Sequence, residues 1–230
     1  MFKQTLKLFI VAIFFGALFT SCKEDSAAPV ITTGSLSLKS EYTTVVLAKS
    51  METSVVDSIK IIRARFCIKD IKFKNAAEDS ANFKAAPFVL DLNLAGTAQT
   101  VGVAEVKFGT YKRIEFDVHR LERPSIAGLT DTLQFVDFLK DERYSVIISG
   151  TMYINGKDSA FTYRSKIDAK QKLDIVPNLV MSEQSNNVSA TLQISSANWF
   201  KFNNQLLDPA DKNNEGKIDE NIKASIKLKK

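Results

Sequence analysis

Apolar and polar residues alternate along most of the chain after about residue 34, which is the pattern of half-buried β-strands. The alternation is clearest in segments 62–74, 88–94, 114–119, 144–148 and 188–194. A break in phase at Asp70 predicts a β-bulge within the first segment. Segment 152–163 reads as a hairpin, because Asn155 and Gly156 at its centre readily adopt the left-handed conformations of a tight turn.

These strands predict an all-β fold. Roughly eight to ten strands separated by turn residues favour an antiparallel β-sandwich over a β-barrel, and the sequence alone leaves both open. No linker rich in Pro, Gly or Ser divides the chain after residue 33, so residues 34–230 are predicted to form a single β-sandwich domain.

The period changes only near the C-terminus. Ile218, Ile222 and Ile226 lie four residues apart, which is the spacing of one helical face. Acids at 219 and 220 precede lysines at 223, 227 and 229, an order that suits the helix dipole. We therefore expect a short C-terminal helix packed on the sandwich.

The N-terminus carries a targeting pattern. Lys3 and Lys7 precede an apolar run over residues 8–19, about a dozen residues long, whereas a membrane span needs about 20. Small residues at 20 and 21 then precede Cys22, an order that resembles the bacterial lipobox. The resemblance implies a signal peptide over residues 1–21, acylation (palmitate) at Cys22, and a tether over residues 22–33. Each buried methylene of an acyl chain adds about 0.8 kcal/mol to such an anchor.

The residues after the cysteine refine the predicted location. Lys23, Glu24 and Asp25 resemble the lysine-plus-two-acids export signal of surface lipoproteins of the phylum Bacteroidota. That resemblance implies a lipid-anchored outer-membrane protein displayed at the cell surface. In the alternative interpretation the three residues only begin a soluble linker, and the protein faces the periplasm.

Five segments extend this resemblance to the domain itself. They are IIRARFCIKDIKFKN, FVLDLNL, GTYKRIEFDVHRLE, SANWF and LDPADKNNEGKIDENIKASI. Together they resemble a group of Bacteroidota lipoprotein domains of unknown function, over most of residues 34–228. The resemblance implies a sandwich fold and an envelope location, and it implies no activity.

Charge argues against nucleic acid as a partner. Loss of Lys3 and Lys7 with the signal peptide reduces the net charge from +5 to +3, and no dense basic run precedes the tail at 223–230. With Cys22 acylated, Cys67 has no partner for an intramolecular disulfide. Cys67 lies among Arg63, Arg65 and Lys69, and we interpret it as an inert strand residue rather than a nucleophile.

Segment 211–222 resembles an incomplete calcium loop. Its oxygen-bearing positions are spaced as in an EF-hand around a central glycine, Gly216; the candidate ligands are Asp211, Asn213, Glu215, the Lys217 carbonyl and Asp219. The twelfth position is Ile222 where a bidentate acid is needed. No cofactor is expected, and calcium is kept as an alternative beside a polar turn leading into a helix.

Other chemistry-bearing residues give weaker patterns. Glu115, Asp117 and His119 share one face of a strand at about 6.5–7 Å spacing, which favours a solvent face over a metal site. Trp199 and Phe200, with Phe202 nearby, could form an exposed sugar-binding platform or close the sandwich core. Acceptors of Asp-Ser/Thr-apolar triplets resemble Bacteroidota O-glycosylation sites: Ser26, Ser58, Ser80, Thr132 and Ser159.

We conclude from the sequence that the protein is a non-enzymatic binding or structural module, with an envelope protein or a glycan as its partner and the membrane contacted through Cys22. The alternative is a surface hydrolase of glycans that uses an unidentified pair of carboxylates. No residue is assigned a catalytic role.

Overall fold

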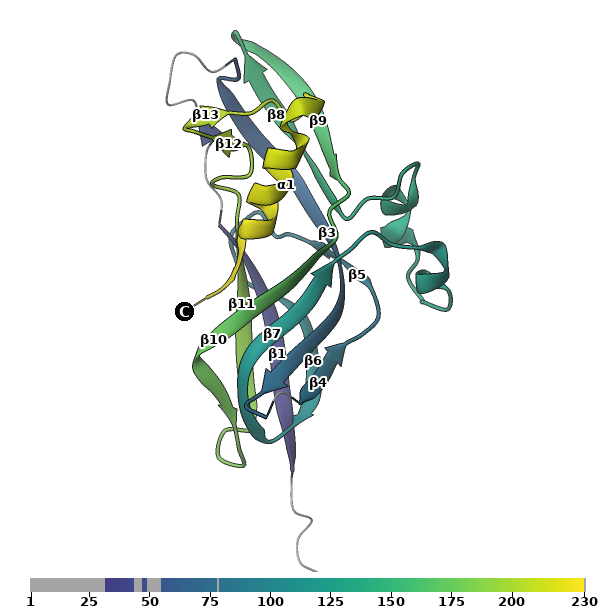
Figure 1. The fold of residues 1–230 in the computed structure, drawn as a ribbon, viewed down its shortest axis with the longest axis vertical. Helices are drawn as coiled ribbons and strands as arrows, with labels where there is room; N and C mark the ends of the chain where they lie inside the picture. The colour runs from purple at the N-terminus through teal and green to yellow at the C-terminus, as the bar shows by residue number, and fades with distance from the viewer. Residues whose placement is uncertain (1–31, 44–46, 49–54, 78, 230) are drawn as a thin grey trace, which may run out of the picture. The chain divides into compact units, whose positions relative to one another are not determined.

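The computed structural model describes residues 32–43, 47–48, 55–77 and 79–229. These residues form an all-β sandwich with one short α-helix (Figure 1). Of the fourteen described strands, ten have four residues or more. The fold class predicted from the sequence is therefore confirmed. Within the described residues, no helix is long and apolar enough to cross a membrane.

Five long strands dominate the larger sheet. The first is β3 (Ser58–Asn75), whose neighbour on one edge is made of two strands running in the same direction. β7 (Gly109–Val118) pairs with the second half of β3, and β8 (Val146–Ile154) pairs with the first half. Beyond them, β10 (Ala169–Met181) pairs with β7 and β9 (Lys157–Ser165) pairs with β8. These five strands thus form three rows: β3 is continuous, the second row is interrupted between β7 and β8, and the third row is interrupted between β10 and β9.

Short strands complete this sheet along the other edge of β3. They are β2 (Leu47–Ala48), β4 (Ser80–Lys84) and β5 (Phe88–Asp91). The predicted bulge is confirmed, since Asp70 has a φ of 54° and the β3–β7 register shifts between Lys69 and Lys72. The predicted hairpin is also confirmed, with positive φ at both Asn155 and Gly156 between β8 and β9.

The second sheet has the strand order β14-β11-β1-β6. Its members are β1 (Thr33–Thr43), β6 (Gln99–Lys107), β11 (Asn187–Ser195) and β14 (Ile226–Leu228). β1 and β11 run parallel, the exception in an otherwise antiparallel fold. The expected C-terminal helix exists as α1 (Glu215–Ala224), but its predicted extent is wrong, because Ile226 belongs to β14 and pairs with Ile194.

The main core fills the space between the two sheets. The core consists of the side chains on the inward face of each strand. As predicted, these include Ile114, Phe116 and Val118 of β7. Between β11 and α1 the chain forms the small pair β12 (Lys201–Phe202) and β13 (Gln205–Leu206), then the turn η4 (Lys212–Asn214). The Tyr163 hydroxyl of β9 donates to Asp219 of α1 at 2.7 Å, which holds the helix against the β8–β9 half of the sheet (Figure 1).

A second, smaller cluster lies on the outward face of the same sheet. Residues 119–145, which connect β7 to β8, form three 3₁₀ turns: η1 (Arg123–Ile126), η2 (Leu133–Phe135) and η3 (Asp137–Leu139). We call this segment the excursion. Its apolar side chains and two strand residues form what we call the outer cluster: Cys67, Leu121, Ile126, Phe135, Phe138 and Ile147.

Candidate functional site

The sequence-predicted anchor and export residues cannot be placed. Cys22, Lys23, Glu24, Asp25 and Ser26 lie outside the described residues. The domain bounds likewise stay a prediction.

The proposed aromatic platform is wrong. Trp199 and Phe200 are both fully buried in the main core. The Trp199 ring packs at 6.1 Å from Tyr42 and 5.9 Å from Phe66, and the Phe200 ring lies edge-on to Phe161 at 5.5 Å. The alternative interpretation, that this segment closes the core, is the one the structure supports.

The calcium-loop geometry is also wrong. A calcium loop needs non-helical backbone around the ion, but Glu215, Lys217 and Asp219 lie within α1. Asp211 accepts the Asn213 backbone N–H at 2.9 Å and so caps η4. Within the described ranges, no group of three His, Cys, Asp or Glu residues lies close enough to hold a metal ion.

Cys67 and Glu115 are both buried, although Glu115 was interpreted as part of a solvent face. Cys67 is fully buried beneath the excursion, and burial raises the pKa of its thiol to about 12, so the thiolate nucleophile is disfavoured. Glu115 is also buried, with its carboxylate 3.5 Å from Lys170 and 3.9 Å from Arg113. Asp117 and His119 are half-buried. The sequence shows which residues share a face, but not that a distant loop covers part of that face.

Four candidate O-glycosylation residues can be placed. Ser80, Thr132 and Ser159 are exposed, while Ser58 is half-buried at the start of β3. Ser80 begins β4 (Ser80–Lys84), and Ser159 lies within β9. Glycosylation at any of them stays a prediction.

The only histidine lies where the long strands are interrupted, a line across the sheet that we call the seam (Cys67, His119, Ser145 and Ser165–Asp168). The Cys67 backbone N–H donates to the Ser145 carbonyl at 2.8 Å, and its carbonyl accepts the His119 N–H at 3.1 Å. The Ser145 N–H donates to the Ser165 carbonyl at 2.9 Å. Backbone pairing therefore crosses the sheet even where the strands break.

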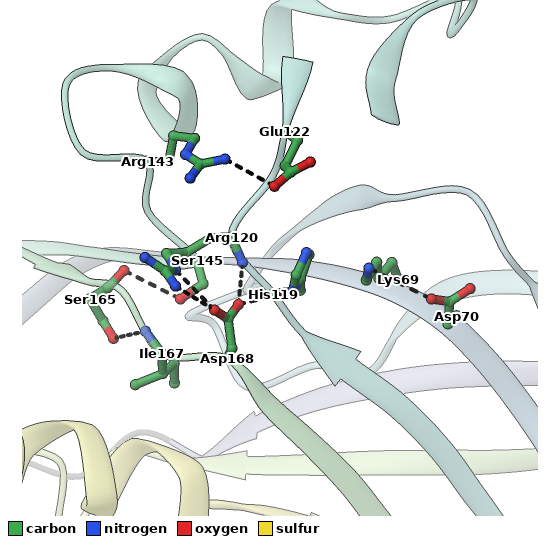
Figure 2. Close-up of polar contacts among 10 residues, drawn as sticks. All are labelled: Lys69, Asp70, His119, Arg120, Glu122, Arg143, Ser145, Ser165, Ile167 and Asp168. Carbon is green, nitrogen blue, oxygen red and sulfur yellow. Dashed lines mark hydrogen bonds and ion pairs between the residues drawn. The ribbon is translucent and has the colours of Figure 1, made fainter. Parts of the chain in front are cut away.

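Asp168 is the polar centre of the seam (Figure 2). Its carboxylate lies 2.9 Å from His119 Nδ1 and accepts three hydrogen bonds from Arg120, one from the backbone N–H and two from the guanidinium, at 2.8–3.0 Å. Burial raises the pKa of the Asp168 carboxyl, but the bonds from Arg120 outweigh it and leave that pKa below its ordinary value. Asp168 thus ties the end of β7 to the start of β10, a structural role.

A groove that the sequence did not reveal lies between the edges of the two sheets, where β10 passes β11 and β14. We call it the edge groove; its volume is about 480 Å³. Apolar side chains from both sheets line it: Leu173, Ile175, Leu179, Ala190 and Leu228. Lys172, Lys227 and Lys229 surround this apolar surface together with one acid, Asp174.

The two edges that border the edge groove differ. β10 bulges outward between Asp174 and Leu179, where it carries the exposed Val176 followed by Pro177. β11 is straight and pairs with β14 only at Leu192–Ile194. The sequence predicts both strands, but it does not say which sheet edges stay open, because that depends on where β14 ends.

Comparison with known proteins adds little. No protein-family model and no curated protein matches the chain. Among solved structures, MbnP from Methylosinus trichosporium is similar with a TM-score of 0.41 and 9% identity, over 72% of this chain and 76% of that one. A function has to be inferred from the residues described above.

Proposed function

We propose that the protein is a lipid-anchored, non-enzymatic binding module of the outer membrane, displayed at the cell surface, and that its ligand occupies the edge groove. The observation that carries this proposal is the combination of an open apolar surface with a basic rim between two sheet edges. Ligand sites in proteins are typically concave and largely apolar, with a few charged groups that orient the ligand.

The alternative function, hydrolysis of glycans, makes a specific demand on the carboxyl groups. A glycosidase needs one carboxylic acid whose pKa is raised, so that it can donate a proton. The described carboxyl groups with a displaced pKa all move the other way: Asp137, Glu142, Asp168 and Glu220. In each case hydrogen bonds from Lys or Arg stabilise the charged form, as Lys140 and Arg65 do for Asp137.

The proposed membrane location is based on the N-terminal sequence pattern. Replacing Cys22 by Ala should release the protein from the membrane fraction, because the acyl chains supply the anchor. Replacing Lys23, Glu24 and Asp25 by Ala should leave it membrane-bound but protected from protease added to intact cells. Mass spectrometry of the N-terminal peptide and of the shaved fragments measures both. Acylated wild-type protein that resists the protease would overturn surface display and leave the anchor in place.

Cross-linking in intact cells tests the edge groove. A photo-reactive amino acid at Val176, on the groove, should form adducts that the same group at Val103 does not form. Val103 is a matched control because it is 62% exposed, against 72% for Val176, and lies on β6, away from the groove. Equal adduct yields at the two positions would contradict the edge groove as the binding surface.

A further inference from the structure

The open edge of β11 presents unpaired backbone to the edge groove. The Lys229 N–H donates to the Thr191 carbonyl at 2.9 Å, so the backbone groups of Thr191 point away from β1. Since these directions alternate along a strand, the backbone groups of Ser189 and Asn187 point the same way. In the described part of the chain, no strand pairs with this side of residues 187–190.

Proteins usually protect exposed strand edges, and β10 follows that rule where β11 does not. Pro177, which lacks a donor, and the bulge over 175–178 prevent regular pairing along β10. Segment 187–190 (Asn-Val-Ser-Ala) has no proline, no bulge and no charge. Of the two edges beside the edge groove, β11 is therefore the one able to accept another strand.

Charge indicates what kind of strand fits. Lys172 and Lys227 are exposed, and neither has a carboxylate partner among the described residues. Lys229 is paired with Glu41 at 2.6 Å. The rim therefore carries two uncompensated positive charges above an apolar surface, which complements a chain whose residues alternate between acidic and apolar.

We propose that the edge groove binds an extended acidic peptide segment of a partner protein, which adds to β11 at residues 187–191 as a strand in line with β14. This inference rests on the proposed function and specifies its ligand. Backbone hydrogen bonds to Asn187 and Ser189 hold the strand, its apolar side chains meet Leu173, Leu179 and Ala190, and its acids face Lys172 and Lys227. About five residues pair, which is about 17 Å of strand.

A synthetic peptide tests the inference on full-length protein solubilised in detergent. The probe is a labelled peptide of about nine residues that alternates Glu with Val, and fluorescence anisotropy measures its affinity. Hydrogen exchange of the protein is followed in parallel. We expect binding, and exchange at the Asn187 and Ser189 amides slowed by about tenfold or more, because strand addition protects the donors that face the groove. N-methylation of alternate peptide amides should abolish both effects.

Charge reversal provides the matched control. Lys172→Glu with Lys227→Glu should weaken peptide binding by about tenfold or more, since it places acids opposite acids. Lys60→Glu with Lys157→Glu makes the same change in net charge at two exposed lysines outside the edge groove, and should leave the affinity within about twofold.

The outcomes separate this inference from the proposed function. Equal affinity for the N-methylated peptide would overturn strand addition and leave the edge groove as a binding site. Adducts at Val176 in cells without any peptide binding, or with binding of a sulfated oligosaccharide instead, would overturn the peptide ligand and keep the proposed function. Absence of both peptide binding and adducts would overturn the two together.

Discussion

The main core and the outer cluster are both fully buried at their centres, yet they are enclosed in different ways. Trp199 in the main core and Phe138 in the outer cluster are each completely buried. Paired strands of two sheets surround Trp199, whereas only 3₁₀ turns of the excursion cover Phe138. Equal burial therefore does not mean equal cooperativity, because a loop without a strand ladder can open while the sheet beneath it stays folded.

The largest effect is expected at the main core. Trp199→Ala should lower the free energy of unfolding by about 3–5 kcal/mol, since it leaves a large cavity among Tyr42, Phe66 and their neighbours. Trp199→Phe should cost clearly less, because Trp199 Nε1 is buried with no hydrogen-bond acceptor among the described residues. Urea unfolding followed by circular dichroism measures both. Equal losses for the two variants would indicate that the indole nitrogen has a partner, such as a buried water.

Phe138→Ala tests the other side of the comparison. We expect the free energy of global unfolding to fall by about 1–2 kcal/mol. The loss is smaller than in the main core because the excursion can open locally, which removes the cavity while the sheet stays folded. Hydrogen exchange should become fast across 120–144 and stay slow in β3 and β7. A uniform acceleration through both sheets would contradict the separation of the two clusters.

Asp168→Asn probes the link between the excursion and the sheet. The substitution weakens the charge-assisted hydrogen bonds from Arg120 and should cost about 1–2 kcal/mol. Asp91→Asn is the control, since it breaks the exposed ion pair with Arg63 and should cost about 0–1 kcal/mol. Chemical denaturation of the two variants side by side gives the difference, and equal costs would argue against a special role for the seam.

The smallest expected effect is a loss of stability of the excursion at low pH. Hydrogen bonds from Lys140 and Arg65 lower the pKa of Asp137 to about 2, from an ordinary value of 3.8. A carboxyl whose folded pKa is depressed stabilises the folded state above its unfolded pKa, and this contribution is lost as the pH falls from about 4 through about 2. Because the Asp137 side chain is 42% exposed, solvent screening limits the effect to less than about 1 kcal/mol. The protection of excursion amides from hydrogen exchange, relative to the rates of unfolded peptide at the same pH, should fall over that interval. Asp137→Asn should remove this loss of protection.

The sequence predicted what local periodicity controls. The inward row of β7, the bulge at Asp70 and the turn at Asn155-Gly156 all follow from the alternation and from residues that tolerate a positive φ. It failed where a distant segment decides burial. Cys67 lies among charged residues in the sequence, and no local pattern indicates that the excursion folds over it and buries it.

The same limit applies to the candidate site. Ile226 continues the four-residue spacing of α1, but pairing with Ile194 draws it into β14 instead. Where β14 ends then determines how much of the β11 edge stays open. The edge groove is therefore a property of tertiary strand pairing, and no motif in the chain predicts it.

The seam has a consequence for protein engineering. Both ends of the excursion are bonded to the backbone of a single residue, Cys67, so they lie side by side, and β7 and β8 continue one another along β3. An insert whose termini are equally close is expected to replace residues 121–144, which keeps Arg120 on Asp168, provided that the insert covers Cys67 and Ile147 as the excursion does. The position between the ends of β7 and β8 is therefore a suitable insertion site for a sensor, an epitope or a foreign domain.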